Sequence, residues 1–505
     1  MKSVLIIRMQ LSACNARRRG QTNPLRYCLK RFVVLDFQPM AKISRLRATP
    51  HKAIPDDNNT IHPEAVYAEG QAPRTPMDLF LCLLIAASLI GVFIASLAGN
   101  IFEPVLHAAQ KAHWFKFILR PSMLWGLMGT LFVGFRTILW FRYRSFPPAT
   151  IHDAPSLTVI IPAYNEGPMV LKAIRSVLSA DYPRGRLEVF VVDDGSTDDT
   201  WKHIKKAATE HPHVVTAFRF SENRGKRAAL DKGFRRAKGE IVVTIDSDSV
   251  IDKGTLLAAV GPFRDPKVGA VAGKVLVYNR NQGVIPNMLH VRFVLSFDFL
   301  RAVQSTYRTV YCCPGALSAY RVSVVRQVLD PWLNQRFLGS PCTYGEDRAM
   351  TNFILSVGYD AVYQRTATVH TVVPWTYRKL CRMYLRWDRS YVREVIHFMR
   401  IVWKRPFWPK VISLIDILIT NARYPVGWAS LVLCVVLSVN DPTTILRLFF
   451  AMGLLSSLNM LYYLYSERSW LFPYGILYSY FSFLTLFWIF PYAILTVRSR
   501  TWGTR

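Results

Sequence analysis

The segment that decides the fold is LTVIIPAYNE, residues 157–166, in which a short β-branched run ends at a proline and polar residues. Two later segments have the same form: LEVFVVDDGS at 187–196 and EIVVTIDSD at 240–248. Apolar spacing typical of helices fills the intervals, at 169–178 and 200–210. Strands that alternate with helices predict an α/β domain with a mostly parallel sheet.

Acidic residues stand where these strands end and again further along the domain. They are Glu166, the pair Asp193-Asp194, Asp246 and Asp248, and Glu346-Asp347 in GEDR. Ligands of such sheets bind beyond the carboxyl ends of the strands, so we expect these carboxylates to converge on one crevice. Two carboxylates one residue apart can hold Mg²⁺ or Mn²⁺ together with diphosphate oxygens, and a separate carboxylate can deprotonate an attacking hydroxyl. Each motif alone could equally be an ordinary strand end or turn, but the complete set in this order favours a catalytic site.

Long apolar runs flank this domain. Residues 79–97 and 123–141 precede it, and each is long enough to cross a hydrocarbon core of ~30 Å. Residues 443–465 and 471–497 follow as clear spans, whereas 411–439 is interrupted by polar residues and Pro425. We expect that interrupted run to form one interfacial helix plus one crossing, which gives three or four passages after the domain.

The composition agrees with a membrane protein. The 505 residues carry a net charge of +30 and are 51% hydrophobic, which excludes intrinsic disorder and disfavours a plain soluble enzyme. The positive-inside rule explains the basic excess without nucleic acid. The eight cysteines form no CxxC pair, so they indicate neither a zinc site nor a disulfide framework, and Cys312-Cys313 is interpreted as packing.

We therefore predict five regions in the chain. They are a basic flexible extension at 1–75, two transmembrane helices at 76–145, a cytosolic α/β domain at 156–375, an amphipathic interface helix at 376–405 and a C-terminal transmembrane region at 406–505.

Arginines define the predicted interface helix. Positions 378, 382, 386, 389 and 393 are all arginine and form one helical stripe beside an apolar stripe, a pattern that also suits simple binding of anionic lipid. Residues 288–300 are predicted to form a second interface helix. Asp416, Asn421 and Arg423 are costly in lipid, so they are expected to face a polar conduit or to form a salt bridge at the membrane boundary.

The set PAYNE, DDGS, DSD, GEDR and RW, followed by membrane spans, resembles the processive family 2 glycosyltransferases, which include hyaluronan, chitin and cellulose synthases. The resemblance covers residues 78–505. The stretches at 313–321 and 337–352 and the terminal WGTR are most similar to hyaluronan synthases. The nodulation chitooligosaccharide synthases share GEDR and the TVVP of residues 371–374.

This resemblance implies a GT-A-type cytosolic domain within a multi-pass α-helical protein of the cell membrane. It also implies residues that bind the donor: Ala163, Tyr164, Glu166 and Asp194 would cradle the uridine, and Lys226 would approach the nucleotide or its sugar.

The resemblance further implies the chemical roles. Asp246 and Asp248 would position the donor and a Mg²⁺ or Mn²⁺ ion, with Asp248 as the metal ligand. Asp347 would act as the general base for inverting attack in one step. Arg386 would neutralise the leaving diphosphate, and Trp387 would stack on the acceptor sugar.

The expected function is polymerisation of an extracellular polysaccharide from UDP-sugars, coupled to membrane export, with partners limited to these donors, the growing polysaccharide and membrane lipids. Hyaluronan made from UDP-GlcNAc and UDP-GlcA is the first choice. Chitin or a chitooligosaccharide, single transfer to a lipid phosphate, and a non-catalytic transporter or scaffold are the alternatives. Met383 replaces the glutamine usual three residues before Arg-Trp, and Pro314 and Ala316 also depart from the hyaluronan synthase pattern.

Overall fold

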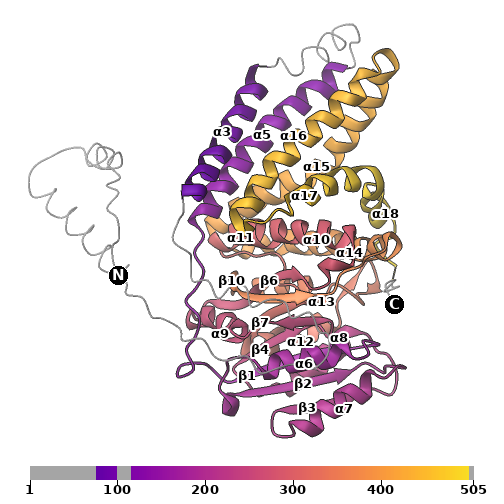
Figure 1. Ribbon diagram of the computed structural model, residues 1–505. Helices are drawn as coiled ribbons and strands as arrows, with labels where there is room; N and C mark the ends of the chain where they lie inside the picture. Colours follow the sequence, from indigo (N-terminus) through magenta and orange to yellow (C-terminus); the bar gives the residue numbers. More distant parts are fainter. Residues whose placement is uncertain (1–75, 99–114, 500–505) are drawn as a thin grey trace, which may run out of the picture. The chain divides into compact units, whose positions relative to one another are not determined.

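The computed structural model describes residues 76–98 and 115–499 (Figure 1). The predicted N-terminal extension and the terminal WGTR lie outside the described residues. The described residues, 76–98 and 115–499, all group into one compact unit by their contacts.

An eight-stranded sheet forms the centre of the α/β domain. Its order is β3-β2-β1-β4-β7-β6-β10-β5. The strands are β1 Leu157–Ala163, β2 Leu187–Asp193, β3 Val215–Arg219, β4 Ile241–Ile245, β5 Ser249–Ile251, β6 Val268–Val277, β7 Leu317–Arg321 and β10 Asp360–Thr371. A separate two-stranded sheet pairs β8 (Arg336–Phe337) with β9 (Ser340–Pro341).

The direction of each pairing confirms the mostly parallel sheet. β1 lies parallel to β2 and β4, and β2 lies parallel to β3. β7 runs antiparallel to both β4 and β6, so β6 has the same direction as β4, and β10 is parallel to β6. Only β7 and β5 of these eight strands run against the others. Every residue of β1 and β4 is buried, as expected for strands covered on both faces.

Helices cover the sheet and connect its strands. The helices predicted between the first strands are found at the expected bounds, as α6 Met169–Leu178 and α7 Thr200–Glu210. The other helices of the domain are α8 Lys226–Arg236, α9 Thr255–Val260, α10 Val284–Val294, α11 Arg301–Thr306, α12 Val322–Leu333 and α13 Glu346–Ser356. A π-helix, Leu295–Leu300, joins α10 to α11, and α10 contacts both β6 and the later helix α17 (Figure 1).

The predicted interface helix is present as α14, Tyr377–Ile401. After it come α15 Phe407–Asn440, α16 Thr443–Glu467, α17 Phe472–Phe481 and α18 Ile489–Leu495; before the domain lie α3 Pro76–Ala98 and α5 Phe115–Arg142. The prediction of two pieces within 411–439 is wrong, because α15 runs unbroken through Pro425. Proline removes one intrahelical hydrogen bond, a loss that membrane helices tolerate when neighbouring groups compensate.

In the described part of the chain, two helices are long and apolar enough to cross a membrane, within α15 and α16. A third span is possible if the pair Phe472–Leu486 and Ile489–Leu495, bent by 45°, counts as one. The apolar part of α3, Leu79–Gly91, is shorter. The crossings expected at 79–97 and 123–141 therefore stay predictions.

Buried ion pairs connect these apolar helices to the domain. Asp298 accepts hydrogen bonds from Arg365 of β10 and from Ser466 of α16. Lys274 of β6 donates to Glu467, the last residue of α16, at 2.6 Å. Of the two alternatives for Asp416, the salt bridge is confirmed: Arg136 of α5 donates to it through Nε at 2.9 Å.

Candidate active site

The loops that follow β1 and β2 are joined by hydrogen bonds into one surface. The backbone N–H of Asn165 donates to Ser196 Oγ at 3.0 Å, and the N–H of Thr197 donates to Asn165 Oδ1 at 2.9 Å. Ala163 is buried, whereas Tyr164 and Glu166 are half-buried on the same loop. The structure thus places three of the residues predicted to bind uridine at one carboxyl end of the sheet.

The two aspartates of DDGS have different environments. Asp193 is fully buried; it accepts the N–H of Ser196 at 3.1 Å and pairs with Arg219 at 3.1 Å. Asp194 accepts the backbone N–H groups of Arg224 at 2.8 Å and Gly225 at 2.9 Å. Burial raises the pKa of Asp194 to about 6, against the lowering effect of those two donors. Asp194 therefore fixes the loop that leads directly into Lys226.

Lys226, the first residue of α8, joins two of the acidic motifs. Its Nζ donates to Asp246 at the end of β4 and lies 3.1 Å from Glu346 Oε1 at the start of α13. Burial alone would lower the pKa of Lys226, but the Asp246 and Glu346 carboxylates raise it above its usual value. A permanent cation therefore lies between two carboxylates that are 100 positions apart in the sequence.

Asp347, the predicted base, lies beside this cation. Its Oδ2 accepts the backbone N–H of Gly315 at 3.2 Å, and its Oδ1 accepts its neighbour Arg348's N–H at 2.7 Å. Burial, followed by the adjacent Glu346 carboxylate, raises the pKa of Asp347. A raised pKa suits a group that must take a proton near neutral pH.

Gly315 allows these groups to approach one another. A Cβ at this position would lie 2.7 Å from Lys226 Nζ and 3.4 Å from each Asp246 carboxylate oxygen. Any side chain here would therefore displace the cation or its partner.

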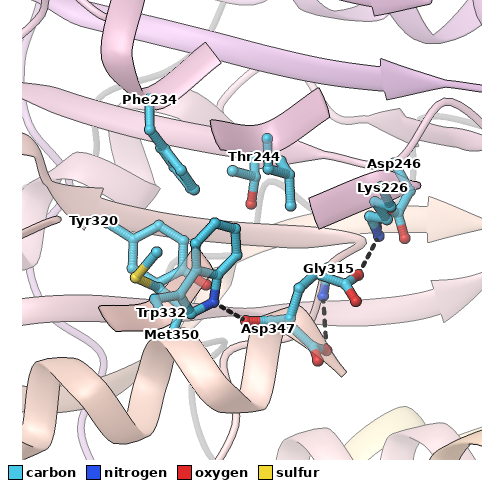
Figure 2. Close-up of a pocket in the computed structure, with 11 residues that line it drawn as sticks. Lys226, Phe234, Thr244, Asp246, Gly315, Tyr320, Trp332, Asp347 and Met350 are labelled. Atoms are coloured by element: carbon cyan, nitrogen blue, oxygen red, sulfur yellow. Dashed lines mark hydrogen bonds and ion pairs between the residues drawn. The ribbon is translucent and has the colours of Figure 1, made fainter. Parts of the chain in front are cut away.

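The pocket that these residues form has a polar end and an apolar end (Figure 2). The polar lining consists of Lys226, Thr244, Asp246, Glu346 and Asp347, with the backbone of Gly315. The apolar lining consists of Leu230, Phe234, Tyr320, Trp332 and Met350. The indole N–H of the buried Trp332 donates to the Glu346 backbone oxygen at 2.9 Å, which fixes the beginning of α13.

Asp248 does not line this pocket, but the charges of two residues that do, Asp246 and Lys226, affect its pKa. It accepts hydrogen bonds from Ser249 at 3.2 Å and Thr371 at 3.3 Å. Burial, followed by the charge of Asp246, raises the pKa of Asp248 to about 6, although Lys226 and the two hydroxyl donors act in the opposite direction.

The residues present fit a divalent metal that is shared with its substrate. Among the described residues, no group of three or more His, Cys, Asp or Glu side chains is arranged to hold an ion. Asp246 and Asp248 supply two carboxylates, so the remaining ligands would be phosphate oxygens and water, which is the usual arrangement for Mg²⁺ with phosphates. A cation would also compensate the charge of Asp248.

Helix α14, which carries the Arg-Trp pair, packs against α13. Gly345 has φ +74°, and a Cβ there would lie 1.8 Å from Ser390 Oγ of α14, so the two helices meet without space for a side chain. Burial would raise the pKa of Glu346, but Lys226 and, to a smaller extent, Arg386 hold it below its usual value. Trp387 is 41% exposed, with Phe293 6.1 Å and Tyr384 5.7 Å away between ring centroids.

The arginine stripe of α14 is only partly available to lipid. Arg389 and Arg393 are buried. Arg389 donates to Thr496 at 2.9 Å and Arg393 donates to Glu394 at 3.0 Å. The alternative in which the whole stripe binds anionic lipid is therefore wrong for these two positions. Met383 is also buried in the core, which accounts for an apolar residue there.

The sequence indicated Glu346 as one of the converging carboxylates but not its pairing with Lys226, and it did not indicate Gly315 as a site residue. GEDR was recognised, but a carboxylate at a helix start gives no sequence signal that it pairs with a lysine 120 positions earlier. Cys312 was interpreted as packing; it is buried and free, yet its Sγ also donates to Asp347 Oδ2 at 3.6 Å.

Known proteins resemble this chain in both sequence and fold. A family model described as glycosyl transferase family 2 matches residues 158–329. The hyaluronan synthase of Streptococcus pyogenes serotype M3 is 32% identical over 289 residues, covering 56% of this chain and 68% of that relative. The chain belongs to the processive family 2 glycosyltransferases. The family recognised from its motifs is thus confirmed.

Other relatives of this glycosyltransferase carry a different name. The N-acetylglucosaminyltransferase of Azorhizobium caulinodans is 34% identical over 250 residues, 49% of this chain. The chain spans 62% of the length of that relative and 58% of its Rhizobium meliloti counterpart. A mannosyltransferase from Pyrobaculum calidifontis, solved with GDP-Man and Mn²⁺, has a TM-score of 0.52 and 24% identity and covers 78% of this chain and 99% of its own. That likeness confirms the GT-A-type fold.

Proposed function

We propose that the chain polymerises an extracellular polysaccharide from UDP-sugars by an inverting, processive reaction. The observation that carries the proposal is the meeting of Lys226, Asp246, Glu346 and Asp347 in one pocket. A fixed cation beside a carboxylate of raised pKa offers what a diphosphate leaving group and an attacking hydroxyl require.

These positions support the following reaction. Asp347 accepts the proton of the acceptor hydroxyl while that oxygen forms a bond to the anomeric carbon of the donor sugar. The bond from this carbon to the diphosphate breaks in the same step, with inversion of configuration and no covalent enzyme intermediate. Lys226 and Arg386 stabilise the negative charge that moves onto the diphosphate.

The remaining predicted residues bind and orient the substrates. Ala163, Tyr164, Glu166 and Asp194 hold the uridine at the ends of β1 and β2. A divalent metal held by Asp246 and Asp248 would supply further positive charge to the diphosphate. The exposed ring of Trp387 stacks on the acceptor sugar, and such a flat contact lets a polymer slide while it remains bound.

Hyaluronan from UDP-GlcNAc and UDP-GlcA is the product we propose first. The similarity to the streptococcal hyaluronan synthase extends over 289 residues, further than the 250 shared with the Azorhizobium N-acetylglucosaminyltransferase. A chitooligosaccharide made from UDP-GlcNAc alone is the second candidate, supported by the slightly higher identity of those relatives.

We also place the catalytic domain on the cytosolic side of the cell membrane, in contact with its lipids. The helices α15 and α16 would then provide a path for export. Reconstitution in sealed vesicles tests this: polymer made from external donors should be protected from added hydrolase inside the vesicles, and fully digestible polymer would contradict export.

The decisive assay for the product uses purified full-length protein with both donors, each radiolabelled in turn, plus Mg²⁺ or Mn²⁺. We expect both labels in a long polymer that hyaluronidase digests. A chitinase-sensitive product from UDP-GlcNAc alone would replace hyaluronan by the second candidate. Transfer of one sugar to lipid, or no transfer by protein that binds UDP, would overturn the proposal.

A further inference from the structure

The short segment before β7 supplies two hydrogen-bond donors to one oxygen of Asp347. The Sγ of Cys312 lies 3.6 Å from Asp347 Oδ2, and the backbone N–H of Gly315 donates to the same oxygen at 3.2 Å. The other oxygen, Oδ1, accepts the N–H of Arg348 at 2.7 Å. Both oxygens of the carboxylate are therefore held, and the thiol is the one side chain among these three donors.

The thiol of Cys312 keeps its proton, as a donor to a carboxylate must. Cys312 is buried and free. Burial, followed by the charge of Asp347, raises the pKa of this thiol to about 12. A protonated, buried thiol is a poor nucleophile and a poor metal ligand, so hydrogen bonding is the chemistry that remains open to it.

The backbone of Cys312 is fixed independently of its side chain. Arg301 donates from Nε to the Cys312 carbonyl at 3.1 Å and from Nη1 to the Ser296 carbonyl at 3.1 Å. The guanidinium carbon of Arg301 also lies 3.9 Å from the centre of the Phe297 ring. Ser296 and Phe297 belong to the π-helix Leu295–Leu300, a form of helix that is frequent at functional sites.

The next residue attaches the segment to the helix that carries the base. The N–H of Cys313 donates to Thr351 Oγ1 at 3.0 Å, and this hydroxyl donates to the Asp347 backbone oxygen at 2.9 Å. Backbone contacts thus place Cys312 opposite Asp347 on α13. Replacing the thiol should therefore change the contact with Asp347 and leave the course of the chain unaltered.

A thiol suits this position because a base must be oriented and still take up a proton. Burial and the Glu346 charge raise the pKa of Asp347, whereas Lys226 and Arg348 act in the opposite direction. Each donor to a carboxylate lowers its pKa further, and a thiol is a weaker donor than a hydroxyl. Cys312 therefore holds Asp347 at a smaller loss of basicity than serine would cause.

We propose that Cys312 is a positioning residue, whose thiol orients the Asp347 carboxylate toward the acceptor hydroxyl while leaving it a strong proton acceptor. The inference rests on the proposed role of Asp347 as the general base and adds the side chain that sets its orientation. Cys312 keeps its own proton during the reaction, so the proton of the acceptor hydroxyl passes to Asp347.

The test measures kcat, as sugar incorporation at saturating donor, between pH 5 and pH 9 for the full-length chain. In the wild type, kcat should rise with pH as Asp347 loses its proton. Cys312→Ser provides a stronger donor, so the midpoint of this rise should move down by about half a unit to one unit. Cys312→Ala provides none, so the midpoint should move up, and the maximal kcat should fall about three- to tenfold with donor KM unchanged.

Cys313→Ala is the matched control, because it also removes a buried thiol next to the same segment. It should keep the wild-type midpoint even if lost packing lowers its melting temperature. The opposite shifts of the two Cys312 variants guard against misfolding, since damage to the fold lowers activity at every pH without moving a midpoint. Unshifted Cys312 variants, or an equal shift in Cys313→Ala, would overturn the inference.

Asp347→Asn separates failure of this inference from failure of the proposed function. If Asp347→Asn loses activity while both Cys312 variants keep the wild-type midpoint, the inference fails and the proposed base stands. If Asp347→Asn retains activity with the same midpoint, Asp347 is not the base and both fail. If the wild type makes no polymer from either donor, the proposed function itself fails.

Discussion

The side of the site that we propose binds the donor (the donor side) and the side that we propose acts on the acceptor (the acceptor side) are built in different ways. On the donor side, the ends of β1, β2 and β4 present Asp194 and Asp246 where consecutive strands of one sheet end. On the acceptor side, Asp347 and Trp387 lie on helices α13 and α14, which meet at Gly345. A parallel sheet positions donor residues by its own geometry, whereas acceptor residues depend on how closely two helices pack.

The largest expected effect concerns the acceptor side. Asp347→Asn keeps the shape of the side chain but removes the base, so polymer formation should fall by ~10²-fold or more, with UDP binding retained. Asp330→Asn, which changes a carboxylate that is 75% exposed, is the control and should keep full activity. Loss of less than tenfold in Asp347→Asn would remove this residue from the chemistry.

The next effect concerns the link between the two sides. Lys226→Met leaves Asp246 and Glu346 without their shared cation, so kcat/KM for the donor should fall about 10- to 100-fold. Lys232→Met on the same helix removes only a cation 4.4 Å from the Phe218 ring and should have little effect. Equal kinetics for both variants would show that the two sides act without this lysine.

A smaller effect is expected where the two sides approach most closely. Gly315→Ala puts a methyl group 2.7 Å from Lys226 Nζ, and the flexible end of the lysine can move at a modest cost. Donor kcat/KM should therefore decrease by roughly three- to tenfold without a change in melting temperature. Gly254→Ala is the matched control, since its Cβ meets no atom within 4 Å. If Gly315→Ala has the same donor kcat/KM as the wild type, Lys226 does not approach this position as closely as the structure indicates.

The smallest effect is a pH dependence of the donor side. The carboxylate form of Asp194 accepts two backbone N–H groups, and its pKa is raised to about 6. As the pH falls from 7 to 5 this acceptor is lost, so the donor KM should rise a few-fold, and Asp194→Asn should weaken that dependence to the part that Asp248, whose pKa is also raised, contributes. A KM that varies equally in both proteins would assign the titration to another group.

The contribution of Asp194 to stability has the opposite pH dependence to its contribution to donor binding. The folded chain binds the Asp194 proton with a pKa of about 6, whereas the ordinary value is 3.8. Between these values the native state holds more protons than the unfolded chain, so this group's contribution to the free energy of unfolding decreases as the pH rises. The decrease ends above the folded pKa.

The contrast between the two sides also explains what the sequence could predict. Local sequence pattern alone predicted the strands β1, β2 and β4, because strands buried on both faces have nearly continuous apolar runs. It also predicted the helices α6 and α7, from their apolar spacing. The antiparallel strand β7 between β4 and β6 has no such local signal, since its direction is set by distant pairing.

The candidate site shows the same difference between residues set by local pattern and residues set by distant contacts. Asp194 and Asp246 were predictable from their place at strand ends, and Asp347 from the resemblance of GEDR. Glu346 as the partner of Lys226, and Gly315 as the point of closest approach, arise only when α8, α13 and the loop before β7 come together. The continuity of α15 through Pro425 likewise had no signal in the sequence.

The most direct test of the central claim is a cryo-electron microscopy structure of the full-length chain with UDP-GlcNAc and Mn²⁺. We expect the diphosphate beside Lys226 and Asp246, and the anomeric carbon facing an opening between Asp347 and Trp387. A nucleotide bound elsewhere, or an anomeric carbon turned away from Asp347, would contradict the account.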